Sequence, residues 1–503
     1  MEKILNIKTE KLVRPPIVVV MGHIDHGKSM ILETIRNIKM LEKESGGITQ
    51  HIGAYEIMHK GKKITFIDTP GHEAFSKIRS RGAKVADLAI LVVAADEGVK
   101  PQTREALEII KENNLPFIVA LNKIDKEEAN PERVKQELAK EEVLVEGYGG
   151  QIPVVEVSAR TGKNVDELLE TILLLAELEN VEAHPDAHAE GVVIEAHLDP
   201  RRGIMATLLI RDGTLRKKDI LVIGRALETI KIFEDFQGNA LEEAGPSSPV
   251  RITGLSQMPV VGDRFGARAT KEEAMGFIKT IPILKAEEKV SLVDTGAAKP
   301  IFNVIVKSDV AGSGEALGEA LKRLESDMIG INIIWNGIGD ISESDVKRAL
   351  ATRMVTIVGF KVRMDPVVRE LAEKSNIRIV TGDVIYDLLD KVKRTAEDFI
   401  PPEIRRNELG KTRILKVFKR EGVKQVVGGR VEEGRIIKGT RVDIRRGKEV
   451  IGTGTLLQLQ REKTPVEEAG AGTECGMMIE MKAAIEQGDV AEAFEEEVMK
   501  KVL

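Results

Sequence analysis

Eight residues near the start of the chain, Gly22-His23-Ile24-Asp25-His26-Gly27-Lys28-Ser29, constrain the fold more than any other stretch. They fit the pattern G-x-x-x-x-G-K-[ST], in which a glycine-rich loop places backbone N–H groups around a phosphate. The apolar, β-branched run at 17–21 before them is typical of a buried parallel strand. After them, residues 30–38 carry apolar side chains at helical spacing. Strand, loop and helix in this order predict a phosphate site, with Lys28 at the outer phosphates and Ser29 on Mg²⁺.

The length of 503 residues is too great for one hydrophobic core and predicts three to five domains. No apolar run reaches the roughly 18 residues that a membrane helix needs, and the N-terminus shows no secretory signal. The single cysteine, Cys475, excludes a disulfide within one chain and is typical of a reducing compartment. We therefore expect a cytoplasmic protein without a membrane partner, and a monomer. A formal net charge of −6 argues against a protein that coats nucleic acid.

The order of elements predicts a multidomain α/β and β protein. Strands alternating with helices indicate doubly wound, mostly parallel sheets, whereas short strands with turns every ten residues or so indicate antiparallel barrels. The predicted parts are a leader (1–13), a P-loop domain with a doubly wound sheet (14–181), a linker (182–190), a β-barrel (191–283), a linker (284–298), an α/β unit with a parallel sheet (299–382), a long linker helix (383–410) and a second β-barrel (411–503).

Two features refine this organisation. The phrase that begins at Asp212, D-G-T-L-R-K-K-D-I-L-V, resembles E-G-R-I-I-K-G-T-R-V-D, which begins near Glu433, and the pair predicts two copies of one barrel. The run Ala311-Gly312-Ser313-Gly314 lacks the lysine and the spacing of a phosphate loop. It therefore predicts a tight turn between a strand and a helix.

Two acidic motifs follow predicted strands of the first domain. Asp68-Thr69-Pro70-Gly71 ends a strand at 63–67, where a carboxylate can hold Mg²⁺ through water and Gly71 can approach a γ-phosphate. Asn122-Lys123-Ile124-Asp125 ends another strand, and the Asp125 carboxylate suits the N1 and N2 donors of guanine. Adenine lacks donors at those positions, so the motifs predict a guanine nucleotide.

Two further segments complete the pattern. Ser158-Ala159-Arg160 ends the next strand and would lie against the guanine carbonyl, and Gly46-Gly47-Ile48-Thr49 lies in a polar loop whose threonine could reach the metal only when the γ-phosphate is present. The sequence thus predicts GTP or GDP together with Mg²⁺. The predicted nucleotide ligands are Gly22, His23, Ile24, Asp25, His26, Gly27, Lys28, Ser29, Asp68, Thr69, Pro70, Gly71, Asn122, Lys123, Asp125, Ser158, Ala159 and Arg160, and the predicted metal ligands are Ser29, Thr49 and Asp68.

Longer runs carry a family resemblance over nearly the whole chain. They are RPPIVVVMGHIDHGKS, SGGITQHIGAYE, DTPGHEAFSKIRSRGA, VAADEGVKPQT, AGPSSPVRITGLS, IVKSDVAGSGEAL, GIGDISESD, VGFKVR and TECG. On these runs the chain resembles bacterial translation initiation factor 2. The resemblance implies a ribosome-stimulated GTPase that brings formylmethionyl initiator tRNA to the small ribosomal subunit and promotes joining of the large one, alongside other initiation factors. Many relatives have a long charged region before the GTPase domain, and its anchoring would be absent here.

The same resemblance assigns two sets of residues. His72, four residues after Asp68, would orient the attacking water and respond to large-subunit RNA; the alternative is a surface histidine on a loop. In the last barrel the resemblance implies a pocket for the aminoacyl end of the tRNA. Its residues would be Gly429, Arg430, Arg461, Lys463, Glu474, Cys475 and Gly476. Relatives often have cysteine at 429 and an aromatic residue at 462, so Gly429 and Glu462 predict weaker recognition of the formyl group.

Charge is unevenly distributed along the last barrel. Residues 411–463 hold 15 Lys or Arg and 6 Asp or Glu, a net of +9, whereas residues 464–503 hold 3 and 10, a net of −7. This predicts that the basic strands, including Arg445 and Arg446, meet tRNA phosphates; the alternative is a barrel with solvated charges. Two other functions remain open on sequence: an elongation or ribosome-assembly GTPase, and a GTP-gated RNA-binding module whose hydrolysis is incidental.

Overall fold

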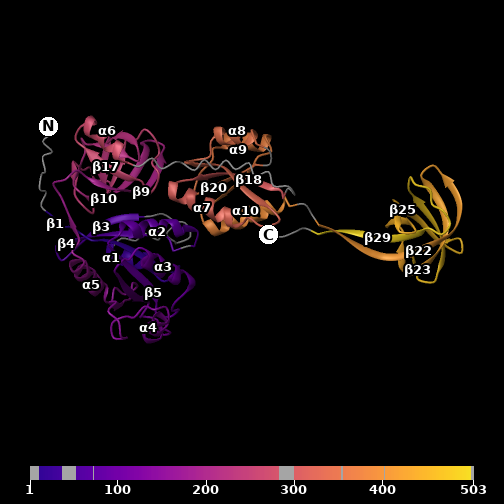
Figure 1. Ribbon diagram of the computed structural model, residues 1–503, viewed down its shortest axis with the longest axis horizontal. Coiled ribbons are helices and arrows are strands. Elements are labelled where there is room, and N and C mark those ends of the chain that lie inside the picture. The colour runs from indigo at the N-terminus through magenta and orange to yellow at the C-terminus, as the bar shows by residue number, and fades with distance from the viewer. Residues whose placement is uncertain are drawn as a thin grey trace. The chain divides into compact units, whose positions relative to one another are not determined.

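A computed structural model describes residues 11–36, 53–71, 73–281, 299–352, 355–400 and 403–499. The chain divides into two compact units, Met1–Ala396 and Glu397–Leu503 (Figure 1). In the described residues no helix is long and apolar enough to cross a membrane.

The first unit begins with a six-stranded sheet in the order β3-β4-β2-β5-β6-β7. All neighbours are parallel except β3, which is antiparallel to β4 at one edge. Its strands are β2 (Ile17–Gly22), β3 (Gly53–His59), β4 (Lys62–Asp68), β5 (Leu88–Ala94), β6 (Phe117–Asn122) and β7 (Val154–Glu156). Every residue of β2 and β5 is buried, as expected of central strands covered on both faces.

Helices cover both faces of this sheet. They are α1 (Lys28–Arg36), α2 (Ser76–Val85), α3 (Pro101–Glu112), α4 (Pro131–Lys140) and α5 (Val165–Leu178), with a short 3₁₀ turn, η3, at Glu73–Phe75. Side chains of α1 and α5 share a core cluster with Val18 and Val20. Because side chains alternate along a strand, Val19 faces the other way, where α2 packs its Gly82 against it. The doubly wound sheet predicted from the sequence is confirmed.

A second, antiparallel sheet follows in the order β13-β12-β17-β9-β10-β16-β14. Its elements are β9 (Glu190–Asp199), β10 (Gly203–Asp212), β12 (Ile220–Ile223), β13 (Ala226–Thr229), β14 (Ile232–Asp235), β16 (Pro249–Thr253) and β17 (Arg264–Arg268), with the small pair β11 (Leu215–Arg216) and β15 (Glu243–Ala244) and the helix α6 (Lys271–Thr280). The segments predicted as leader and linker also contain ordered structure. β1 (Leu12–Val13) pairs with β8 (Glu182–Ala183), so the ends of the first domain are tied together.

A buried arginine joins the first two domains. Arg14 is 8% exposed, and its guanidinium binds both carboxylate oxygens of Asp87 at 2.7 and 2.8 Å and the Ser247 hydroxyl at 3.0 Å. The Ser247 carbonyl in turn accepts a hydrogen bond of 2.7 Å from the Thr65 hydroxyl of β4. The antiparallel sheet is therefore attached to the nucleotide domain through a charge-assisted, solvent-shielded network.

The third part of this unit is a parallel four-stranded sheet in the order β19-β18-β20-β21. Its elements are β18 (Ile301–Ser308), α7 (Ala311–Arg323), β19 (Gly330–Ile338), α8 (Glu343–Leu350), β20 (Val355–Phe360), α9 (Pro366–Lys374), β21 (Arg378–Gly382) and α10 (Ile385–Glu397). The α/β prediction is confirmed. The glycine-rich run near 312 lies in the first turn of α7 and not in a separate turn. A Cβ at Gly312 would lie 3.2 Å from Cδ1 of Ile78, so glycine lets α7 approach α2.

The prediction of a linker helix over 383–410 is wrong in extent and in role. The helix α10 has 13 residues, and its apolar face, which includes Ile385, Leu388 and Val392, is fully buried. This face packs as the last helix of the α/β unit because it has an apolar partner there. The chain then enters strand β22 (Glu403–Glu421), so residues 403–410 belong to the second unit.

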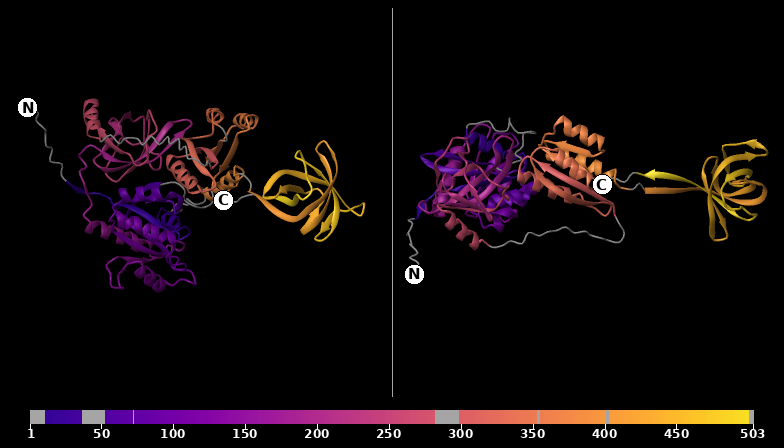
Figure 2. Two further views of the ribbon diagram at one scale, coloured as in Figure 1. Left: turned by 45° about the vertical axis from the view of Figure 1, so that its right-hand side comes forward. Right: turned by 90° about the horizontal axis from the view of Figure 1, so that it is seen from above.

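The second unit is a closed antiparallel barrel. Strand β22 pairs with both β29 and β23, which closes the ring β22-β29-β24-β25-β28-β23. The other strands are β23 (Lys424–Ile437), β24 (Arg441–Arg446), β25 (Glu449–Arg461), β26 (Thr464–Pro465), β27 (Glu468–Gly470), β28 (Glu474–Glu480) and β29 (Val490–Met499). The outer parts of β22 and β29 extend from the barrel as a two-stranded ribbon (Figure 2).

The two antiparallel parts share one topology. The order β13-β12-β17-β9-β10-β16 corresponds, strand by strand along the chain, to β25-β24-β29-β22-β23-β28. In the second unit the pairing of β25 with β28 closes the ring, whereas β13 and β16 are not paired in the first. The repeated phrase in the sequence thus reflects a repeated fold.

Candidate nucleotide-binding site

The loop between β2 and α1 depends on two glycines. Gly22 has φ +142°, and a Cβ there would lie 2.3 Å from the carbonyl oxygen of Val92 in β5. Gly27 has φ +87°, and its Cβ would lie 2.3 Å from the amide nitrogen of Asn122 at the end of β6. Only glycine lets the loop lie this close to the neighbouring strands. The loop is therefore held at the carboxyl edge of the sheet.

Lys28 places its ammonium inside this loop. Nζ donates to the carbonyls of Gly22 at 2.9 Å and His23 at 2.7 Å, and the residue is 7% exposed. Burial lowers the pKa of Lys28 to about 8, an effect that the charge of Asp68 partly offsets. The loop thus holds a desolvated cation whose charged form an anion would favour.

The segment after β4 lies against the same lysine. Asp68 is 3% exposed at the end of β4, and a Cβ at Gly71 would lie 2.5 Å from Lys28 Nζ. The Thr69 hydroxyl donates to the carbonyl of Val20 at 2.8 Å, which joins β4 to β2. The Asp68–Gly71 motif and the phosphate loop, 39 or more residues apart in the sequence, therefore share one site.

Asn122 connects the phosphate loop to the segment after β7. Its Nδ2 donates to the carbonyl of His26 at 2.9 Å, and its Oδ1 accepts from the backbone N–H of Ala159 at 3.0 Å. Both ends of one buried amide are thus satisfied by two different loops. Removing this side chain would leave a buried donor and a buried acceptor without partners.

Asp125 is held by the neighbouring loop but remains open to solvent. Its Oδ1 accepts from the Ser158 hydroxyl at 2.7 Å, and this hydrogen bond is the largest cause that lowers the pKa of Asp125. Lys123, two residues before Asp125, has φ +65°, and its Nζ donates to a carboxylate oxygen of Glu97 at 2.9 Å. Arg160 follows in the same exposed rim. The carboxylate is therefore oriented and ionised, as recognition of two base donors requires.

Several residues that support this site carry no signal in the sequence pattern. The Gln102 side chain accepts from the backbone N–H of Ile24 at 2.9 Å, and the Thr34 hydroxyl donates to the carbonyl of Ala159 at 2.7 Å. Arg79 is 1% exposed, donates to the carbonyl of Pro70 at 3.0 Å and pairs with Glu105. These side chains hold the loops in place through hydrogen bonds to backbone atoms, and only the fold shows which backbone atoms they reach.

His26 is a neutral part of the loop. The ring is fully buried, with Nδ1 3.3 Å from the carbonyl oxygen of Val92, and the ring of His23 lies edge-on at a centroid distance of 5.0 Å. Burial lowers the pKa of His26 to about 4. A neutral imidazole that donates to Val92 fits this contact.

The two predicted switch residues, Thr49 and His72, lie outside the described residues. Of the predicted metal ligands, Ser29 lies in the first turn of α1 and Asp68 at the end of β4. A hydroxyl and a carboxylate are hard oxygen donors, and Mg²⁺ is commonly held by one or two of these together with phosphates and water. The residues present therefore fit this ion.

Six of the seven residues predicted to bind tRNA lie on the neighbouring strands β23, β28 and β25 of the barrel, and Lys463 lies in the turn after β25; the set occupies two faces of the sheet. Gly429 pairs with Cys475 and Arg430 with Glu474 across β23 and β28. Gly429 and Cys475 face the core: the thiol lies 3.7 Å from the Gly429 carbonyl, and burial raises the pKa of Cys475 to about 11. Arg430 and Glu474 face solvent. The pocket expected from the resemblance is thus split by the sheet itself.

The remaining members of this set lie on the outer side. Gly476 pairs with Gly428 and with Gln460, and Arg461 opens a tight turn in which Glu462 and Lys463 both have positive φ. Among the described residues no ion-pair partner is found for the basic side chains of this set. They are Arg430, Arg461 and Lys463.

The basic segment 411–463 and the acidic segment 464–503 are not separated in the folded barrel. Strand β24 pairs with the acidic β29, so Arg445 donates to Glu492 at 2.8 Å, and Arg446 donates to Asp489 at 2.9 and 3.0 Å. Arg445 and Arg446, which were predicted to meet tRNA phosphates, are therefore already paired with carboxylates of a strand that is distant in sequence and adjacent in the fold. Their contact with tRNA stays a prediction.

Comparisons with known proteins decide the family. Residues 14–177 match the family model "Elongation factor Tu GTP binding domain", residues 188–268 "Elongation factor G domain 2", and residues 284–393 "Translation-initiation factor 2". Translation initiation factor IF-2 from Bacillus subtilis (strain 168) is 43% identical over 494 residues, which cover 96% of this chain and 69% of that protein. The chain belongs to the translation initiation factor 2 family. Its first domain is a GTP-binding domain of the elongation factor Tu type.

Other comparisons define the extent of the match. IF-2 from Halalkalibacterium halodurans is 43% identical, with 96% of this chain and 67% of that protein covered. IF-2 from Desulforamulus reducens is 42% identical, with 98% of this chain and 51% of that protein covered. The chain thus spans between half and about two thirds of these IF-2 relatives. The crystal structure of GDP-bound aIF5B from Aeropyrum pernix is 30% identical and covers 96% of this chain and 92% of that one, with a TM-score of 0.48.

Proposed function

We propose that this initiation factor binds GTP and Mg²⁺, carries formylmethionyl initiator tRNA to the small ribosomal subunit, promotes joining of the large subunit and hydrolyses GTP on the assembled ribosome. One observation carries the nucleotide part of the proposal. Asn122 bonds to His26 of the phosphate loop and to Ala159 of the loop beside Asp125, so the two loops that would hold the two ends of a guanine nucleotide are joined.

In this site the chain's residues bind and orient the nucleotide. Backbone N–H groups of the loop and Lys28 would hold the β- and γ-phosphates, and Asp125 would accept from guanine N1 and N2 while Ala159 faces the guanine carbonyl. Ser29, Asp68 and Thr49 would hold Mg²⁺. The ion, when bound, would neutralise charge that develops on the transferred phosphoryl group.

The chemical step would be gated by residues near Gly71. His72 would orient the attacking water, and Arg79, which holds the Pro70 carbonyl, would keep the preceding segment in place. A ribosome that positions His72 would supply the organisation that the isolated chain lacks. Such positioning can lower a phosphoryl-transfer barrier by about 4–7 kcal/mol.

The barrel of the second unit would receive the tRNA. Arg430, Arg461 and Lys463 offer cations that no acidic residue of the described barrel neutralises, whereas most of the other barrel cations are paired. These three would meet phosphate near the aminoacyl end, with Glu474 and Gly476 beside them. Cys475 would support this surface from the core. A factor that acts on ribosomes would be located in the cytoplasm and would have other initiation factors as partners. We propose that the free factor is a monomer.

The base assignment is tested by Asp125→Asn. The variant exchanges an acceptor for a donor, so GDP binding should weaken by about 1–3 kcal/mol while xanthosine diphosphate, which offers an acceptor, should bind better. Titration calorimetry with both nucleotides measures the exchange of preference. The control is Asp186→Asn, at an exposed position outside the site. Unchanged GDP affinity in the Asp125 variant would refute the assignment.

The catalytic assignment is tested by turnover with and without ribosomes. His72→Ala should bind GTP and ribosomes but lose most of the ribosome-stimulated rate, whereas Thr49→Ala should reduce the difference between GTP and GDP states. A His72→Ala variant with the parent rate on ribosomes would remove the catalytic role. A parent protein that ribosomes do not stimulate would favour a GTP-gated binding module.

The tRNA assignment is tested by charge reversal in the full chain. Arg430→Glu with Arg461→Glu should weaken binding of charged and uncharged initiator tRNA alike and reduce the salt dependence. Arg435→Glu is the matched control, because Arg435 is an exposed barrel cation already paired with Glu468. Equal binding by the double variant and the parent would exclude this surface.

A further inference from the structure

A cavity of about 980 Å³ lies in the first unit, away from the nucleotide loop. Its walls come from helix α2, strands β9 and β17, helix α6 and the start of α7. None of the described residues predicted to bind nucleotide or Mg²⁺ lines it. Its volume is at the upper end of the range for small-molecule sites in proteins.

The floor and roof of the cavity are apolar. Val192 and Ile194 of β9 alternate with Val193, which lies in the core of the second domain, so these two side chains face away from that core, on the side that α2 lines with Ile78 and Val85. Val192 is half-buried and keeps accessible apolar surface. The central space therefore suits an apolar group.

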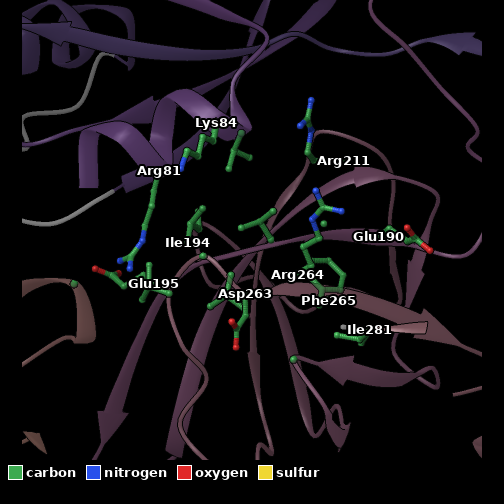
Figure 3. A pocket seen from close by; sticks show the side chains of 18 of the residues that line it. Arg81, Lys84, Glu190, Ile194, Glu195, Arg211, Asp263, Arg264, Phe265 and Ile281 are labelled. Atoms are coloured by element: carbon green, nitrogen blue, oxygen red, sulfur yellow. The ribbon is translucent and has the colours of Figure 1, made fainter. Parts of the chain in front are cut away.

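Cations without partners border one side of this space. No ion pair is found for Lys84 or Arg264 in the part of the chain that the structure describes. Arg211 reaches Asp87 only at 3.5 Å, and that carboxylate already accepts from Arg14 at 2.7 and 2.8 Å. Figure 3 shows Arg211 and Arg264 extending toward the side of the cavity where α2 carries Lys84.

The acidic groups of the lining are elsewhere or engaged. Glu190 pairs with Arg268 at 3.0 Å and Asp212 with His184 at 3.0 Å, while the cation Arg81 is neutralised by Glu315 of α7 at 2.6 Å. Asp263 is half-buried, and in Figure 3 its carboxyl points to the side opposite Arg264. The positive side of the cavity is therefore not cancelled by its own lining.

We propose that this cavity binds a small amphipathic anion, with an apolar body between Val192 and α2 and an acidic group beside Lys84 and Arg264. Such a ligand would cover the apolar surface that Val192 leaves accessible and would pair with two exposed cations that have no ion-pair partner in the described residues. It would also bridge α2 to the second domain. Because α2 holds the Pro70 carbonyl through Arg79, the occupant would restrain the segment after Asp68.

Two fluorescent probes that differ in one group test the proposal in the GDP-bound full chain. 8-Anilinonaphthalene-1-sulfonate has an apolar body and an anion, and N-phenyl-1-naphthylamine has the same body without the charge. The parent should bind the sulfonate at one saturable site. The double variant Lys84→Gln, Arg264→Gln should weaken the sulfonate about tenfold and leave the neutral probe within about twofold. Arg201→Gln with Lys218→Gln, two exposed cations of the same domain outside the cavity, is the matched control.

A localisation experiment keeps the proposal testable if the double variant does not fold. Hydrogen exchange of the parent should slow in α2 and β17 when the sulfonate is added, and Val192→Phe, which fills the floor, should weaken both probes. The proposal is overturned if the double variant binds the sulfonate as the parent does, if it loses both probes equally, or if protection appears away from α2 and β17. None of these readouts depends on GTP hydrolysis, so the proposed function can fail independently.

Discussion

Nucleotide binding should be coupled to proton uptake by Lys28. In the empty site burial holds the pKa of Lys28 at about 8, well below the value of an exposed lysine. A bound diphosphate places negative charge beside Nζ and restores the charged form, so its pKa rises. Below pH 8 the lysine is already protonated in the empty site, and above pH 8 binding must bring the proton with it.

The magnitude follows from the fraction of neutral lysine. With a pKa of about 8, GDP binding takes up about 0.1 proton at pH 7, about 0.5 at pH 8 and about 0.75 at pH 8.5. The same fractions predict that GDP affinity falls about fourfold between pH 7 and pH 8.5, or about 0.8 kcal/mol. The sign is fixed, because the bound state holds the proton more tightly than the empty state.

Titration calorimetry measures this uptake as the dependence of the binding heat on the ionisation enthalpy of the buffer. Lys28→Arg is the matched variant, since arginine stays charged throughout this range and should take up no proton at this position. Contributions from the guanine base and the phosphates are common to both proteins. Equal uptake by the two proteins at pH 8.5 would refute the reasoning, as would no uptake by the parent.

Three further predictions concern other parts of the chain. Because the pKa of His26 is lowered to about 4 and its unfolded value is near 6.5, the empty protein should lose about 2 kcal/mol between pH 7 and pH 5 in urea unfolding, and His26→Asn should flatten this loss. Arg14→Met should destabilise the first unit by about 3–5 kcal/mol, since Asp87 is left buried without its partner, and adding Asp87→Asn should recover part of it. Glu462→Tyr should tighten tRNA binding in filter assays, whereas Gly429→Cys should chiefly lower the melting temperature of the barrel.

The sequence predicted where the motif segments lie because parallel strands end at one edge of a sheet. Residues that follow β2, β4, β6 and β7 must meet at that edge, so the order of the motifs was enough to place Lys28, Asp68 and Asp125 there. It did not predict Arg79 or Gln102, whose partners are backbone carbonyl and N–H groups that no side-chain pattern reveals. The buried face of α10 was misread for a similar reason. The apolar face of an amphipathic helix indicates that the helix packs against another element, but the sequence does not identify that element.

Two of the barrel residues that the family resemblance assigns to a tRNA pocket face the core of the barrel. Alternation along β23 and β28 makes position 429 and the Cys475 side chain face the core, so neither faces a ligand outside the barrel. A Cβ at Gly429 would lie 2.7 Å from Thr412 Cγ2 and 2.8 Å from Met477 Cε, so the cysteine of relatives would require repacking here. Glu462, in contrast, lies in the exposed turn that carries Arg461 and Lys463.

The two departures from the family should therefore act by different routes. Glycine at 429 alters how the core beneath the tRNA surface is packed, and its effect should appear as a change in barrel stability. Glutamate at 462 places an anion between two cations, which weakens attraction for phosphate directly. The loss of tRNA affinity caused by Glu462 should therefore be sensitive to salt, because that residue alone of the two faces the solvent in which tRNA arrives.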